Sequence, residues 1–383
     1  MISTTYSKLP GTSTTIFTVM SQLAAENNAI NLSQGFPDYE ADPKLIALVA
    51  DAMKNGHNQY APMTGIPALR ELIADKVSRL YGADYNPDTE ITITAGGTQA
   101  IFTALSAYIG AGDEVIIFEP AYDSYAPTIK MLGGLVKPYE MAPPDYDIDW
   151  EMVKKLFTVN TKMIILNSPH NPTGAILRDK DIEALIKLTK DSDILILSDE
   201  VYEHLIYDGE QHRSLALYPE LRERTFIVGS FGKLLHTTGW KTGYCLAPNY
   251  LMKEFRKVHQ FNVFSVNTPM QVGIAQYLKD PATYAGLSAF FQEKRDLFRS
   301  LMGQTKFKLL PCNGSYFQCV TYSDISDETD VAIAQRLVKD FSVASIPVSA
   351  FYIRNTDHHV LRFCFAKKHD TLEKAVERLM KLT

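Results

Sequence analysis

Short apolar runs separated by helical patterns constrain the fold of this chain more than any other feature of its sequence. The runs are rich in Ile, Val and Leu with little polar alternation, which is typical of parallel strands buried on both faces. Because helical patterns such as 67–81 and 179–190 lie between them, we predict an α/β fold with a mostly parallel sheet between helices. The predicted strands are Glu90–Thr94, Glu114–Phe118, Val136–Tyr139, Met163–Leu166, Ile194–Leu197 and Phe226–Val228.

The pattern changes after Tyr244. A chain of 383 residues is long for one core, so we predict two domains. Residues 43–283 are assigned to a large domain and 284–383 to a small α+β domain, which the N-terminal arm and segment 1–42 join. The predicted elements of the small domain are a linking helix Tyr284–Met302, strand Ser315–Val320, helix Thr329–Phe341, strands Ala344–Ile346 and His359–Phe365, and helix Leu372–Leu382.

The composition argues against several classes of partner. Apolar residues make up 46% and charged residues 21%, as in ordinary globular proteins. Because the net charge is -6 and no long basic run occurs, we expect no nucleic acid and no membrane as partner. No apolar run reaches the roughly 20 residues that span a bilayer. The four cysteines match no zinc or redox spacing, so we expect buried, reduced thiols in a cytoplasmic protein.

Suitable groups for a ligand recur where the predicted strands end. Gly97, Tyr122, Asn171, Asp199 and Lys233 each come after a different apolar run. Ligands of open α/β sheets bind at the carboxyl ends of the strands. Five such ends are therefore stronger evidence for a ligand site than any single motif.

Two lysines stand in the stretch from Ser230 to Gly243. Lys233 follows a strand and a glycine turn, and Lys241 lies eight residues further on, in Gly-Trp-Lys-Thr-Gly. One lysine that can lose its proton and one that stays charged fit a pyridoxal phosphate (PLP) site, where the first bonds to the aldehyde and the second holds the phosphate. Taken alone, Ser-x-Gly-Lys favours the alternative that both are surface lysines beside tight turns.

The other strand ends offer groups that this cofactor needs. Asp199 could hold positive charge on the pyridine nitrogen by Coulombic attraction, although it also fits an ordinary helix cap. Asn171 and Tyr202 could donate to the phenolate oxygen of the ring, and Tyr122 could cover its face. The candidates for the phosphate are the amides near Gly97 and Thr98, Ser230 and Lys241.

Two further residues are candidates for contacts with a substrate. Arg362 lies on the apolar strand Leu361–Phe365, where an arginine is costly unless it is paired or faces a ligand. Its planar fork suits a substrate carboxylate, and the alternative is an internal salt bridge. Gly35, in the turn Ser33–Asp38, allows the backbone to approach a ligand closely.

With these motifs in this order, the chain resembles the fold-type I, class I PLP-dependent aminotransferases from Phe17 to Leu382. Within that class it is similar to the methionine aminotransferase and kynurenine aminotransferase/glutamine transaminase K group, through Ser33–Asp38 and Ile346–Phe351. The motifs that carry the resemblance are Asn31–Asp38, Asn58–Tyr60, Asn171–Gly174, Asp199–Tyr202, Ser230–Lys233, Gly239–Lys241 and Arg362–Phe365.

The resemblance implies a mostly parallel sheet of the seven-stranded type, and a homodimer with shared active sites. It also implies transfer of an amino group between an L-amino acid with a neutral side chain and a 2-oxo acid. The implied catalytic residues are Lys233, Asp199 and Tyr202. The implied substrate contacts are Gly35, Asn171, Arg362, Phe17 and Phe264. The implied cofactor contacts are Gly97, Thr98, Gln99, Tyr122, Asn171, Asp199, Tyr202, Ser230, Lys233, Lys241 and Tyr60 of the partner subunit.

Two positions depart from the group, and there are three alternatives to transamination. Phe17 stands where kynurenine-transaminating relatives usually carry tryptophan, which leaves kynurenine open as a donor. Ser265, after Phe264, replaces a histidine often found there, which changes the polar edge of the pocket. One alternative is a β-lyase that acts on cysteine conjugates at the same site. A PLP-sensing regulator module is disfavoured by the acidic charge and by the short segment before Phe17. A catalytically inactive relative is disfavoured because Lys233, Asp199 and Arg362 are all present.

Overall fold

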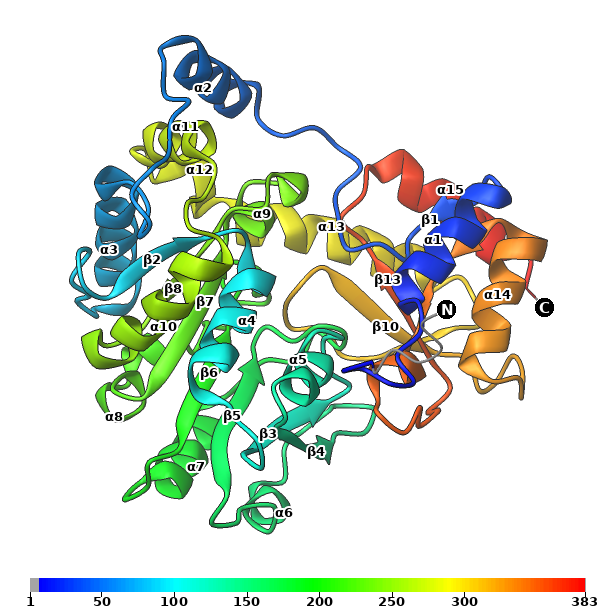
Figure 1. Cartoon of the computed structure of the whole chain (residues 1–383). Helices are drawn as coiled ribbons and strands as arrows, with labels where there is room; N and C mark the ends of the chain where they lie inside the picture. The colour runs from blue at the N-terminus through cyan, green and yellow to red at the C-terminus, as the bar shows by residue number, and fades with distance from the viewer. Residues whose placement is uncertain (1–6, 383) are drawn as a thin grey trace, which may run out of the picture.

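The computed structural model describes residues 7–382. Residues 1–6, the first part of the predicted N-terminal arm, lie outside the described residues. Figure 1 shows a large sheet with helices on both sides and, at the right of the view, a smaller sheet with α1, α14 and α15 beside it. Helix α13 (Leu287–Met302) lies between the two sheets in this view.

The large sheet has seven strands in the order β2-β8-β7-β6-β5-β3-β4. Strand β8 is antiparallel to both of its neighbours, and the other neighbouring pairs are parallel, so the predicted mostly parallel sheet is confirmed. The carboxyl ends of β2, β3, β5, β6 and β7 consequently meet at one edge. The bounds are β2 Ile91–Thr94, β3 Glu114–Glu119, β4 Leu135–Glu140, β5 Thr161–Asn167, β6 Leu195–Asp199, β7 Thr225–Ser230 and β8 Gly243–Leu246.

The central strands are buried on both faces, as their apolar runs predicted. In β3, Val115 and Ile117 belong to the core on one face, while Ile116 and Phe118 belong to the core on the other. The first face is covered by α4 (Gly97–Tyr108), α5 (Tyr125–Met131) and α10 (Asn249–Asn262). The second is covered by α3 (Pro67–Tyr81), α6 (Trp150–Lys154), α7 (Asp179–Thr189) and α8 (Pro219–Arg222).

The small sheet has the strand order β12-β13-β10-β9 and is antiparallel throughout. Near it, β1 (Ile30–Asn31) pairs in parallel with β11 (Val343–Ala344), and α1 (Ile16–Glu26) packs against α14 (Asp330–Phe341). The N-terminal segment therefore contacts the C-terminal part of the chain. The remaining bounds here are β9 Lys308–Leu309, β10 Phe317–Thr321, β12 Ile346–Pro347, β13 Val360–Cys364 and α15 His369–Leu379.

Two predictions of local structure need correction, and some elements were not predicted. The predicted helix Tyr284–Met302 is two helices, α12 (Ala282–Ala285) and α13, which Gly286 separates because glycine is a poor helix former. The predicted strand Ala344–Ile346 is divided between β11 and β12, since the chain passes there from one sheet to the other. Strand β8 and the short helices α5 and α6 were not predicted. At the top of Figure 1, α2 (Pro43–Lys54) packs against α11 (Thr268–Leu278).

All four cysteines are buried and none forms a disulfide. Within residues 7–382, no cluster of His, Cys, Asp and Glu side chains could hold a metal ion. No helix in the same range is both long enough and apolar enough to cross a bilayer.

Candidate active site

A cavity of about 360 Å³ lies where the strands of the large sheet end. It is bounded on its other side by residues of the small sheet and of the N-terminal segment, among them Arg362, Phe317 and Phe17. Three of the predicted site residues do not line it: Gln99, Tyr60 and Phe264. The predicted residues that do line it are Phe17, Gly35, Gly97, Thr98, Tyr122, Asn171, Asp199, Tyr202, Ser230, Lys233, Lys241 and Arg362.

Lys233 lies in the single-turn helix α9 (Phe231–Leu234), directly after β7. Its amine donates hydrogen bonds to Tyr316 Oη at 2.6 Å and to Gly35 O at 3.1 Å. Burial, assisted by the positive charges of Lys241 and Arg362, lowers the pKa of the Lys233 amine to about 8. About one amine in ten is then uncharged at pH 7, so Lys233 can act as a nucleophile and as a base. For Lys233, the alternative of a surface lysine is wrong.

Asp199 is the last residue of β6 and is buried. Tyr125 Oη donates to its Oδ2 at 2.6 Å, and the Val201 N–H donates to its Oδ1 at 3.4 Å. Burial raises the pKa of the Asp199 carboxyl to about 6, against the opposing effects of the Tyr125 bond and of Lys233. A protonated ring nitrogen beside it would favour the carboxylate form. No helix begins at Asp199, so the helix-cap alternative is wrong.

Asn167 is a site residue that the sequence analysis missed. It is the last residue of β5, and its Nδ2 donates to Asp199 O at 2.9 Å while its Oδ1 accepts from the Asn171 N–H at 2.9 Å. One side chain therefore fixes the backbone of two predicted cofactor ligands. The rule that selected Asp199, a polar residue at the end of a buried strand, would also have selected Asn167.

The start of α4 forms the anion-binding side of the cavity. The N–H groups of Gly97, Thr98 and Gln99 lie in its first turn, where no helix carbonyl can accept from them. Lys241 Nζ lies beside this turn, 3.5 Å from the position of a Cβ built on Gly96. Backbone amides and an ammonium group together suit a phosphate.

Gln99, one of the predicted cofactor contacts, turns its side chain away from the cavity. Its Oε1 accepts from the Ala95 N–H at 3.0 Å, and its Nε2 contacts Thr103 Oγ1 and His259 Nδ1. As the third residue of the helix, Gln99 reaches back over the first turn instead of into the cavity. Only its backbone N–H remains available to an anion.

Arg362 lies in the middle of β13 and is completely buried. Its Nη1 donates to Asn171 Oδ1 at 2.7 Å and its Nη2 donates to Ser33 O at 2.8 Å, while its buried Nε has no partner. The guanidinium carbon lies 3.9 Å from the ring centre of Phe317. Among the described residues no carboxylate pairs with Arg362, so the salt-bridge alternative is wrong. An uncompensated buried cation of this kind is a site for an anionic ligand.

Gly35 approaches aromatic rings as well as the cavity. A Cβ built on it would lie 2.8 Å from Phe317 Cζ, so any other residue would displace that ring. Its carbonyl accepts hydrogen bonds from Lys233 and from Tyr316. The backbone at Gly35 therefore makes a close approach, as predicted, but to the ring of Phe317 in the cavity wall.

Tyr60 and Phe264 lie outside the cavity of their own chain. Their rings touch edge to face at 5.2 Å, and the two residues are 81% and 57% exposed. Phe261, next to the last residue of α10, is 88% exposed. Of the predicted site residues Phe17, Tyr122, Tyr60 and Phe264, this chain brings only Phe17 and Tyr122 to its own cavity. The other two belong to an exposed aromatic surface.

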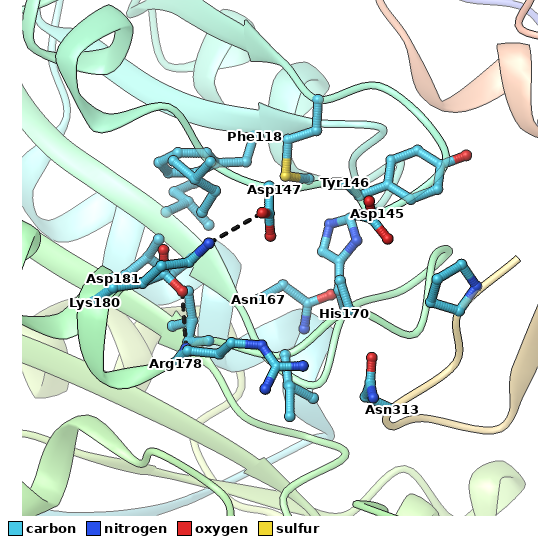
Figure 2. A pocket seen from close by; sticks show the side chains of 18 of the residues that line it. Phe118, Asp145, Tyr146, Asp147, Asn167, His170, Arg178, Lys180, Asp181 and Asn313 are labelled. Atoms are coloured by element: carbon cyan, nitrogen blue, oxygen red, sulfur yellow. Dashed lines mark hydrogen bonds and ion pairs between the residues drawn. The ribbon is translucent and has the colours of Figure 1, made fainter. Parts of the chain in front are cut away.

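A second cavity, of about 250 Å³ and here called the rear cavity, shares Asn167 with the first. Figure 2 shows Asn167 and His170 inside it, with an ion pair between Lys180 and Asp147 at 3.0 Å near them. Burial lowers the pKa of His170 to about 3, so this ring is neutral. Asn167, which donates to Asp199 O, lines both cavities, and Tyr125, which donates to Asp199 Oδ2, lines the rear cavity.

The family profile "Aminotransferase class I and II" matches residues 27–379. The chain belongs to this family. It is 46% identical over 377 residues to the methionine aminotransferase of Escherichia coli, with 98% of each chain covered, and 33% identical to the human kynurenine–oxoglutarate transaminase 1, with 94% of each covered.

Two solved structures show the same architecture. A crystal structure from Escherichia coli, reported with a methionine aminotransferase function, superimposes with a TM-score of 0.96 at 46% identity and covers 99% of this chain and 100% of that one. The N-succinyldiaminopimelate aminotransferase of Mycobacterium tuberculosis gives 0.95 at 34% identity, with 99% and 100% covered. The relatives named here are all aminotransferases or transaminases, so the β-lyase alternative gains no support.

The protein is therefore a PLP-dependent aminotransferase, and its cavity fits the cofactor. A buried carboxylate, a lysine with a lowered pKa, and a helix start beside an ammonium group match the three polar parts of PLP. When bound, PLP supplies the electron sink that stabilises negative charge at the α-carbon of the substrate. The residues of the chain have to position the substrate and move its protons.

Proposed function

We propose that the protein transfers the amino group of neutral L-amino acids, methionine foremost, to 2-oxo acids. The observation that carries this proposal is the buried Arg362 guanidinium, which has free N–H groups, aromatic neighbours and no carboxylate partner. It would bind the carboxylate that all donors share. The name of the Escherichia coli relative supports methionine as the donor.

The proposed roles of the other residues follow from their chemistry. Lys233 attaches the cofactor, takes the α-proton of the substrate and returns it, because its amine is available in both protonation states near neutral pH. Asp199 keeps the ring nitrogen charged. Asn171 and Tyr202 donate to the phenolate oxygen. The proposed phosphate contacts are Ser230, Lys241 and the amides of Gly97, Thr98 and Gln99.

Asp123 supports the choice of neutral donors. It lines the cavity, and burial raises the pKa of its carboxyl while the nearby Arg362 lowers it. A second substrate carboxylate would meet this acidic group and the rings of Phe17 and Tyr122, where an unpaired charge is costly. A thioether gains from leaving water and from contact with aromatic rings.

A donor series with one 2-oxo acid acceptor tests this. We expect the kcat/KM for methionine to exceed that for aspartate by roughly a hundredfold or more. Asp123→Asn should lower the ratio of the kcat/KM for methionine to that for aspartate, because it removes a carboxylate that repels the second carboxylate of aspartate. Asp147→Asn, in the rear cavity, should leave this ratio unchanged. An aspartate value equal to or above that for methionine would overturn the donor assignment.

We further propose a homodimer in which Tyr60 and Phe264 complete the active site of the partner subunit. This proposal is supported by the aromatic pair itself, which is exposed and does not line the cavity of its own chain. Exposed aromatic rings are characteristic of protein interfaces.

Subunit complementation tests this arrangement. Chains with Tyr60→Ala and chains with Lys233→Ala are each purified, unfolded together and refolded, so that about half of the dimers are mixed. A mixed dimer holds one site with both residues intact, so activity should return to about a quarter of the wild-type value. If Tyr60 served its own chain, no site would be intact and mixing would restore nothing.

We also propose a cytoplasmic location. The support is the presence of four unpaired, buried thiols, which is typical of proteins from a reducing compartment. Fractionation of the native cells, with an antibody to this chain, tests the proposal. Recovery of the protein outside the cytoplasm would refute it.

A further inference from the structure

Tyr316 is a buried aromatic residue beside the cavity that none of the motifs includes. It is 1% exposed and stands one residue before β10. Its hydroxyl donates a hydrogen bond to Gly35 O and accepts one from Lys233 Nζ at 2.6 Å. Lys233 Nζ also donates to Gly35 O at 3.1 Å. Because the two acceptors are hydrogen-bonded to each other, they lie on the same side of the lysine amine.

The Tyr316 ring has little freedom to move. Its centre lies 4.9 Å from that of Phe317 and 5.1 Å from that of Tyr202, with steep edge-to-face angles of 71° and 81°. Phe291 contacts it at 5.9 Å. Close-packed aromatic neighbours of this kind hold a ring in one rotamer. The hydroxyl is therefore a fixed acceptor for the amine.

The contact with Tyr316 affects the direction of the lone pair on the Lys233 amine. An uncharged amine has two N–H groups and one lone pair, and here Tyr316 Oη and Gly35 O, which are hydrogen-bonded to each other, lie close enough together to share one N–H group. The second N–H group and the lone pair then take the two remaining tetrahedral directions, both of which point away from these acceptors. We propose that Tyr316 is a catalytic residue that, with Gly35 O, directs the lone pair of the free Lys233 amine toward the α-proton of the substrate.

This inference rests on the proposed proton transfer by Lys233. The step it concerns is the transfer of one proton from the α-carbon of the substrate to the amine. The lone pair forms the N–H bond as the Cα–H bond of the substrate breaks, and the two electrons of that bond remain on the substrate–cofactor unit. The resulting ammonium has three N–H groups, of which one keeps this acceptor pair. Without the Tyr316 hydroxyl, that N–H keeps only the longer bond to Gly35 O, so the amine rotates more easily about its Cε–Nζ bond.

Tyr316→Phe removes the hydroxyl and keeps the ring. Single turnovers of the PLP-loaded enzyme with methionine, followed by the visible absorption of the cofactor, should become about threefold to tenfold slower. The isotope effect with α-deuterated methionine should rise, and the KM should stay within about twofold. Tyr85→Phe is the matched control, because its buried hydroxyl has no hydrogen-bond partner and lies outside the cavity.

A second measurement does not depend on turnover. The full chain is loaded with pyridoxamine 5′-phosphate, which leaves the lysine amine free, and the Lys233 peptide is acetylated at a series of pH values and quantified by mass spectrometry. An acceptor stabilises the ammonium more than the uncharged amine, so Tyr316→Phe should lower the titration midpoint of Lys233 by about half to one pH unit. Tyr316→Met is the second variant should Tyr316→Phe fold poorly.

The outcomes separate the two hypotheses. An unchanged Lys233 midpoint, or a raised KM with an unchanged isotope effect, would show that Tyr316 only supports the substrate carboxylate site and would overturn this inference. Full activity in Lys233→Ala would instead overturn the proposed role of Lys233. A lowered midpoint with a larger isotope effect supports the inference.

Discussion

Replacement of Arg362 by lysine is the most direct test of the substrate site, because it keeps the charge and removes the planar fork. A guanidinium has five N–H donors. Two of them are used by Asn171 Oδ1 and Ser33 O, which leaves three, enough for a parallel pair of bonds to a carboxylate. A lysine ammonium has three N–H donors, so the same two structural bonds would leave one for the substrate.

The expected loss is therefore one charge-assisted hydrogen bond, about 1.5–3 kcal/mol. That corresponds to a KM raised by roughly ten- to a hundredfold for every amino donor, whatever its side chain. The stacking of the guanidinium on Phe317 is lost as well, which adds to the effect in the same direction. The chemical step should change less than the KM, because the carboxylate is bound in both the ground state and the transition state.

Competition by two fragments of methionine makes the assay specific. 4-(Methylthio)butanoate retains the carboxylate and lacks the amine, and 3-(methylthio)propylamine retains the amine and lacks the carboxylate. In Arg362→Lys the inhibition constant of the butanoate should rise as the KM does, while that of the amine should stay within about twofold. Arg224→Lys is the control, because Arg224 bonds Ser192 O and Ile194 O at the opposite end of β6. Equal weakening of both fragments would refute the carboxylate role of Arg362.

Three further predictions concern the cofactor, pH and packing. Asp199→Asn should bind PLP but lose turnover by several orders of magnitude, and a variant within about tenfold of wild type, about 1.4 kcal/mol, would exclude the proposed charge effect. Burial lowers the pKa of His259 to about 4, so the stability that the neutral ring confers is complete above about pH 6.5 and is lost as the pH falls toward 4. In chemical denaturation, the free energy of unfolding of wild type should exceed that of His259→Gln by an amount that shrinks by about 1.4 kcal/mol per pH unit over this window. A difference that stays constant with pH would contradict this. Gly243→Ala should destabilise the fold by about 1–3 kcal/mol and weaken PLP binding, because the new Cβ would lie 2.7 Å from Gly229 O and 3.0 Å from Gly97 N. A melting temperature and a PLP dissociation constant equal to those of wild type would show that the backbone moves aside at little cost.

The residues at the strand ends were predictable because parallel strands share one carboxyl edge. That geometry made neighbours of Gly97, Asn171, Asp199 and Lys233, which lie far apart in the sequence. Burial of the strands on both faces was predictable for a different reason: their apolar runs lack the polar alternation of a strand with one exposed face. Arg362 was found by a different rule: a charged residue in a buried strand needs a partner or a ligand.

The direction of individual side chains was not predictable. Gln99 follows the anion-binding turn in sequence, yet its side chain returns to the Ala95 N–H, because its position in the first helical turn places that donor within reach. Tyr125 and Tyr316 lie in segments with no motif, and only the fold brings their hydroxyls to Asp199 and Lys233. For Tyr60, the assignment to the partner subunit came from the resemblance and from no local pattern.

The turn at residues 33–35 connects the two halves of the proposed chemistry. Ser33 O accepts from Arg362, which would bind the substrate carboxylate, and Gly35 O accepts from Lys233, which would move the α-proton. The turn itself is fixed by Asn31, whose Oδ1 accepts from Ser33 Oγ at 2.7 Å and from the Ser33 N–H at 3.0 Å. Since β1, which contains Asn31, pairs with β11, the N-terminal segment sets the distance between the carboxylate site and the lysine amine. A shift of this segment would therefore misplace both ends of the substrate together.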